Sequence, residues 1–152
     1  MINQRKWSAK GQMIVEFAFV FPFFLLVIFG GLIDFGIAFN NILTLQEIAN
    51  AAAQAGGDAG VADAASSAAL TVNNLRSQLN LQLYSNFEWS SELASRADAV
   101  GGYSVISVHV KANSRIFTPF YQTMFGAISG SPSLPIVAQA VYPILQNKLN
   151  NP

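Results

Sequence analysis

The hydrophobic pattern divides the chain into a bilayer-length apolar run and a longer, more mixed region. From Phe17 to Ile33 about thirteen side chains are strongly apolar and none is charged. At about −0.3 to −0.6 kcal/mol each, they favour membrane insertion by about 4 to 8 kcal/mol, against about 3 kcal/mol for one carboxylate at mid-membrane. The run therefore predicts a membrane-spanning helix over residues 12–39, between a leader of residues 1–11 and an exported domain of residues 40–152.

Two residues stand out within this helix. Pro22 has no amide hydrogen to donate to the carbonyl of Ala18, so we expect a kink or a loosened turn there. Asp34 lies near the end of the apolar run, where a carboxylate reaches headgroups or a partner at a smaller cost. Both are interpreted as features of the membrane helix.

Helical spacing continues beyond the apolar run. Apolar positions from Asn40 to Gln54 recur every three or four residues, which predicts that one long helix leaves the bilayer. The glycine-rich segment 56–60 predicts its end. Its later part presents a stripe of small residues, namely Ala49, Ala52, Ala53 and Gly56. This stripe suits either close approach of another backbone or packing on the chain's own domain.

The exported region then changes from helical to alternating periodicity. Val61 to about Leu79 predicts a second, amphipathic helix. Alternation predicts strands over about 79–89, 103–112 and 134–142, with a helical or irregular link over 90–98 and a long connection over 113–134. In the middle strand, Val108 is expected on the buried face and His109 on the wet face. The expected fold class is α+β, with a long N-terminal membrane-spanning helix, a second helix and an antiparallel sheet of about three strands.

Charge sets the expected orientation. Arg5, Lys6 and Lys10 precede the run and the next basic residue is Arg76, so we expect a cytoplasmic N-terminus and an exported C-terminal domain. Without cysteine, the domain uses no disulfide, which is compatible with a bacterial periplasm. Loss of residues 1–11 would leave five basic against eight acidic residues. No basic patch for nucleic acid is expected.

The sequence carries little that favours catalysis. His109 is the single histidine, cysteine is absent, and no metal-ligand spacing or phosphate-binding glycine loop is found. Asp58 and Asp63 flank a glycine-containing turn, and turn chemistry explains them better than calcium binding. We expect no catalytic residue, no metal site, no cofactor and no enzymatic activity.

The start of the apolar run carries a more specific pattern. Gly11 and Gln12 follow a basic leader, and Glu16 and Phe17 open the run. This arrangement resembles the class III signal of type IV pilins and pseudopilins. The resemblance implies that a prepilin peptidase cuts between Gly11 and Gln12, and that Glu16 pairs with the new amine of another subunit during assembly.

A broader likeness narrows the family. The segments 15–18 and 31–39, with Pro22 and the alanine-rich continuation to Gly57, are similar to TadE-like proteins of the tight-adherence (Flp, type IVb) pilus. Segments 105–112, 117–120 and 136–142 resemble the end of that domain. The likeness implies a pilin-like subunit at the bacterial inner membrane, and the size of the chain with its exported domain favours a minor or accessory role. Its partners would be a prepilin peptidase, other pilin-like subunits, an inner-membrane assembly platform and lipid.

Two other interpretations stay open at this stage. A secretory signal peptide would be cut after Gly36-Ile37-Ala38, although the apolar run is long for such a peptide and contains Glu16. An uncleaved single-pass anchor that displays a periplasmic binding or sensing domain fits the hydrophobicity and the charge bias equally well. The N-terminus of the mature protein separates all three.

Overall fold

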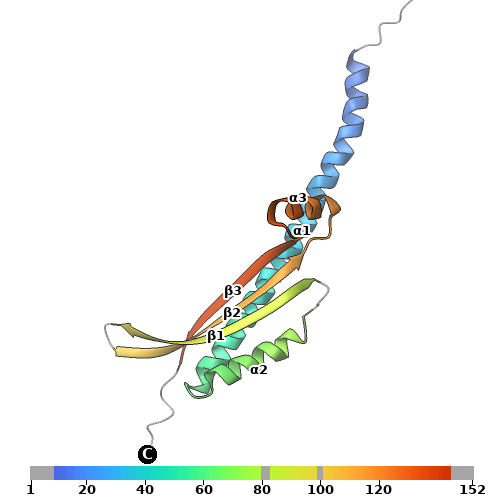
Figure 1. Ribbon diagram of the computed structural model, residues 1–152. Coiled ribbons are helices and arrows are strands. Elements are labelled where there is room, and N and C mark those ends of the chain that lie inside the picture. Colours follow the sequence, from blue (N-terminus) through green and yellow to red (C-terminus); the bar gives the residue numbers. More distant parts are fainter. Residues whose placement is uncertain (1–8, 80–82, 99–100, 145–152) are drawn as a thin grey trace, which may run out of the picture.

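The computed structural model describes residues 9–79, 83–98 and 101–144. One long helix forms the axis of the molecule, and a second helix and a three-stranded antiparallel sheet lie beside its C-terminal half (Figure 1). The elements in chain order are α1 (Ala9–Ala59), α2 (Ala64–Arg76), β1 (Tyr84–Asp98), β2 (Gly101–Arg115), α3 (Pro119–Ser129) and β3 (Ser133–Pro143). The predicted α+β class is confirmed.

Helix α1 is a single element of 51 residues that runs through Pro22 and past the apolar run. It is the one helix of the described residues that is long and apolar enough to cross a membrane, judged by length and composition. Gly56 and Gly57 were expected in the helix stop, but both lie inside α1. The helix ends at Ala59, and Gly60 takes the left-handed conformation that closes it, with φ of +83°.

The sheet has the order β1-β2-β3, so β2 is its central strand. Alternate residues of β2 are fully buried, among them Ile106, Val108, Val110 and Ala112. His109 is half-buried on the other face, as predicted. Strict alternation would place Val105 on the same face as His109, yet Val105 is 3% exposed. Strand β3 alternates in the same way, with Ile136, Ala138 and Ala140 buried.

The core lies between the sheet and the C-terminal half of α1, and α2 packs beside that part of α1 and contributes to the same core against β1 and β2 (Figure 1). Small side chains allow this close packing. Ala49 and Ala52 are fully buried and Ala53 is 1% exposed, so the small-residue stripe packs within its own domain. Of the two interpretations of the stripe, packing on the chain's own domain is therefore the one observed within this chain.

Two predicted connections were wrong. Residues 90–98 continue strand β1, because each pairs with β2 in register, from Ser90 opposite His109 to Asp98 opposite Gly101. Hydrogen bonds to a neighbouring strand override the low strand propensity of this polar segment. The connection 113–134 contains helix α3, with Pro119 in its first turn and left-handed Gly130 at its C-terminal end.

The other boundaries shift by a few residues. Helix α2 is shorter than the predicted 61–79. Strand β1 begins at Tyr84, later than the predicted start at about residue 79. Residues 80–82, where the first strand was expected to run, lie outside the described residues. A bulge between Ser85 and Glu88 follows, with Asn86 at φ of 52°. The last strand extends one residue beyond each end of its predicted range.

Candidate functional site

The N-terminal part of α1 projects from the domain. Nearly every residue from Gly11 to Phe29 is exposed, including Phe17 at 62% and Phe19 at 79%. All of them except Gly11 lie within residues 12–39, which the sequence assigns to the membrane. A helix that is apolar on all sides and exposed is suited to lipid or to other apolar helices.

The predicted processing and assembly residues lie together at the start of this exposed helix. The Gln12 Nε2 atom donates a hydrogen bond to Glu16 Oε1 at 3.2 Å, one turn later. Phe17 stacks on Phe21, with ring centroids 5.1 Å apart. Gly11 is exposed, and a Cβ built on it would meet no atom within 4 Å. This arrangement leaves Glu16 accessible to another molecule.

Asp34 has a different environment from Glu16. It is 5% exposed, and its Oδ1 accepts a hydrogen bond from the backbone N–H of Phe117 at 2.8 Å. The N–H of Thr118 donates to both carboxylate oxygens, at 3.3 and 3.1 Å. Asp34 therefore binds the backbone just before α3 rather than headgroups or a partner. The carboxylate also faces the positive end of the α3 helix dipole.

Further contacts hold α3 against α1 on the N-terminal side of Asp34. The Thr118 hydroxyl donates to the carbonyl of Gly30 at 3.3 Å, and the Tyr121 hydroxyl donates to the carbonyl of Val27 at 3.0 Å. A Cβ on Gly30 would lie 2.7 Å from Thr118 Cγ2, and one on Gly31 would lie 2.6 Å from the Tyr121 hydroxyl oxygen. The glycine pair thus permits the contact with α3.

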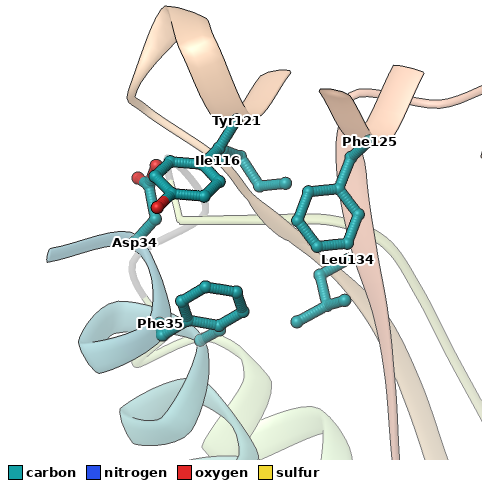
Figure 2. Close-up of a pocket in the computed structure, with 7 residues that line it drawn as sticks. Asp34, Phe35, Ile116, Tyr121, Phe125 and Leu134 are labelled. Carbon is teal, nitrogen blue, oxygen red and sulfur yellow. The ribbon is translucent and has the colours of Figure 1, made fainter. Parts of the chain in front are cut away.

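Aromatic packing completes this junction. Figure 2 shows Phe35, Tyr121 and Phe125 around a small cavity beside Asp34, with Ile116 and Leu134 on its other sides. The Phe35 ring centroid lies 5.9 Å from that of Tyr121 and 6.4 Å from that of Phe125. The cavity volume, about 10 Å³, is at the lower limit for one water molecule. The junction is a packed contact and not a ligand pocket.

Sequence reasoning missed a second polar contact of α1. Asn41 is fully buried, and its Nδ2 atom donates to Ser114 Oγ at 2.8 Å and to the Leu83 carbonyl at 3.4 Å. Asp34, Ala38, Asn41 and Leu45 follow one another at helical spacing along the buried side of α1. Extending the apolar stripe of residues 42–53 towards the N-terminus at the same spacing would have predicted that Asp34 and Asn41 are buried.

The family comparison covers the membrane helix and its continuation. Residues 11–54 match the family described as TadE-like protein. The TadE-like resemblance predicted from the sequence is confirmed for this segment, which includes Glu16, Pro22, Asp34 and Asn41. The match indicates a pilin-like protein associated with the tight-adherence pilus.

The TadE-like segment ends inside α1, so α2, the sheet and α3 lie outside it. The three later segments that also resemble the family are not part of the match. No curated protein and no solved structure matches the chain. The long apolar helix indicates membrane anchoring.

The titratable side chains of the described residues are dispersed over the fold. Within the described ranges, no group of three or more His, Asp or Glu residues is placed to hold a metal ion. The half-buried His109 sits mid-strand opposite Ser90 on one side and Gln139 on the other. The exposed apolar part of α1 is the feature of the described residues whose function calls for an explanation.

Proposed function

We propose that this protein is a minor or accessory pilin-like subunit of a tight-adherence pilus or a related secretion filament. Its helix α1 holds it in the bacterial inner membrane, with the N-terminus cytoplasmic and residues 40–152 periplasmic. After extraction, the same apolar surface packs against other subunits in the filament. The observation that supports this most directly is the exposed apolar part of α1, with Glu16 accessible near its start.

Processing at Gly11 is part of the proposal. A prepilin peptidase would bind residues near the cleavage point in an extended form, where glycine offers no side chain to obstruct a narrow site. Cleavage between Gly11 and Gln12 would create an amine one turn from Glu16, because Gln12 and Glu16 are four residues apart. Glu16 of one subunit then pairs with the amine of the next. The assembly platform of the inner membrane would draw such subunits out of the lipid.

N-terminal sequencing of the native protein, compared with Gly11→Leu and Gly11→Ala, tests the processing step. We expect the native protein to start at Gln12, the leucine variant to stay uncut and the alanine variant to be cut more than the leucine variant. Neither side chain disturbs the fold, since the Cβ position of Gly11 is in open space. A start at Met1 in the native protein would favour the uncleaved anchor that displays a periplasmic binding or sensing domain. A start at Phe39 would favour a secretory signal peptide.

A further inference from the structure

Helix α3 exposes an apolar surface that the domain does not use. None of its residues is buried. Phe120 is 42% exposed and Ile128 is 77% exposed, and Phe117 just before the helix is 47% exposed. Large apolar side chains gathered on one short helix are uncommon on a surface that meets only water.

The inner and outer sides of α3 are both apolar. Tyr121 and Phe125 face the junction with α1, where they pack near Phe35 (Figure 2). A shallow groove on the helix surface is lined by Pro119, Phe120, Thr123, Met124 and Ala127. A soluble helix normally turns a polar side to solvent, and α3 has only scattered hydroxyl and amide groups to offer.

Helix α3 and the segments that flank it in the sequence carry no charged side chain. No Asp, Glu, Lys or Arg occurs between Arg115 and Lys148 in the sequence. A charged side chain at the bilayer centre is costly, and the penalty for immersing this region is correspondingly small. The rest of the exported domain carries charges on α2, β1 and β2, for example Arg76, Glu88 and Lys111.

Helix α3 contacts α1 about one bilayer thickness away from Gln12. From Gln12 to Phe29, α1 rises about 26 Å, close to the hydrocarbon thickness of about 30 Å. The contacts of α3 with Val27, Gly30 and Asp34 begin where this exposed stretch ends. In Figure 1, α3 lies across α1 at the level between the free part of α1 and the sheet. A helix across a membrane-spanning helix runs parallel to the membrane surface.

We propose that α3 is an interfacial helix, whose outer apolar face, formed by Phe117, Phe120, Met124 and Ile128, inserts into lipid at the boundary between headgroups and acyl chains. The occupant is the membrane itself, because α3 docks on α1 at the level where the exposed apolar stretch of α1 ends. Asp34, Thr118 and Tyr121 fix the helix at that depth. The inference goes beyond the proposed function. It requires only that α1 anchors the protein, and it holds whether or not the chain is cleaved or assembled.

The absence of native cysteine allows a direct test with single labels. The full-length protein carrying Ile128→Cys and an environment-sensitive fluorophore is reconstituted in vesicles of phosphatidylethanolamine and phosphatidylglycerol. Matched variants carry the label at Phe19→Cys in the apolar part of α1 and at Leu93→Cys on β1, which are 79% and 49% exposed. Quenching by lipids with a nitroxide near the headgroup is compared with quenching by aqueous iodide.

We expect the Ile128→Cys label to be quenched by shallow nitroxide lipids severalfold more than the Leu93→Cys label, and by iodide severalfold less. The Phe19→Cys label should respond best to deep nitroxides. Iodide quenching equal to that at Leu93→Cys would overturn the proposal, because α3 would then face water. Protection from both quenchers would also overturn it, because a second protein copy would then cover the helix. A label at Phe120→Cys, the second residue of α3, provides an independent measurement of depth at the other end of the helix.

The depth measurement does not depend on the proposed pilin function. N-terminal sequencing measures processing, and filament purification measures assembly. The vesicles contain neither peptidase nor assembly platform, so the depth of the label is measured independently of both. Uncut protein with a lipid-quenched Ile128→Cys label would reject the processing step alone. Correctly processed protein with an iodide-quenched label would reject the interfacial helix alone.

Discussion

Glu16 and Asp34, the two carboxylates that bound the apolar run, have opposite environments. Glu16 is exposed and is contacted by Gln12 of its own helix. Asp34 is buried and accepts hydrogen bonds from two backbone N–H groups of another segment. A buried carboxylate with such donors is held by its own fold, whereas an exposed one in an apolar helix is available to a partner. The two residues therefore call for different experiments.

Glu16→Ala is expected to separate membrane insertion from assembly. Removal of the carboxylate favours insertion by about 2 to 3 kcal/mol if the site lies deep in the membrane. The variant should thus reach the membrane at a normal level and be processed normally, but should disappear from purified filaments because the Gln12 amine lacks its partner. Immunoblots of membranes and sheared filaments measure this. Glu47→Ala, an exposed acid later in α1, is the control and should assemble normally. Normal assembly of Glu16→Ala would reject the pairing.

Asp34→Ala is expected to loosen α3 from α1. The N–H groups of Phe117 and Thr118 would lose their acceptor, at a cost of about 1 to 3 kcal/mol for a buried unsatisfied group. The full-length protein in detergent should melt at a lower temperature and be cut faster by protease around α3. Asp58→Ala removes an exposed acid of the same helix and should change stability by less than about 0.5 kcal/mol. Equal melting and equal cutting of both variants would contradict the role given to Asp34.

At the scale of elements, glycines in α1 have packing roles that differ along the helix. Gly56 and Gly57 are buried where α1 meets the start of α2 and the end of β3. A Cβ on Gly57 would lie 2.8 Å from the carbonyl oxygen of Pro143 and in collision with the Tyr142 ring. Gly36, in contrast, has open space at its Cβ position. The same substitution should therefore have opposite effects at the two sites.

Gly57→Ala should destabilise the domain by about 1 to 3 kcal/mol, because backbone has to move to admit the methyl group. Gly36→Ala should leave stability unchanged or raise it by up to about 1 kcal/mol, since alanine is the better helix former. Thermal unfolding of the two full-length variants in one detergent measures the difference. A Gly57→Ala protein that melts with or above Gly36→Ala would show that the helix does not approach β3 this closely.

At the scale of the whole molecule, one helix serves two environments. Its first part is exposed and apolar, and its second part is the central support of a folded domain. Contacts from α3 begin at Val27, so the folded domain starts within the range 12–39 that the sequence assigns to the membrane. We infer that the lipid-embedded part ends near Phe29 and that residues 30–39 lie at the periplasmic surface.

This arrangement predicts which parts of the protein are reached from outside the cell membrane. A thiol reagent that does not cross membranes should label Leu70→Cys, 65% exposed on α2, in intact spheroplasts. Ser8→Cys in the leader should react only after lysis, or be absent if the leader has been removed. The positive-inside rule supplies the reason, because Arg5, Lys6 and Lys10 would keep the leader in the cytoplasm. Labelling of Leu70→Cys only after lysis would reverse the proposed orientation.

The sequence by itself determined the long helix, the α+β class, the faces of β2 around Val108 and the TadE-like segment. These depend on local periodicity and composition, which the chain carries at each position. It also contained the signals for α3, in Thr118-Pro119 and Gly130, although only a long connection was predicted over residues 113–134. Helix ends marked by proline and glycine are local features too.

Only the tertiary structure decided what the segments contact. The strand over residues 90–98 exists because β2 supplies its hydrogen bonds. The local sequence pattern of this segment does not predict that pairing. Asp34 and Phe117 are 83 positions apart, so burial of the carboxylate depends on α3 docking at Gly30 and Gly31. The alanine stripe of α1 suited a neighbouring subunit as well as the chain's own sheet. Packing settled the choice, because burial free energy depends on which surfaces meet in space and not on their order along the chain.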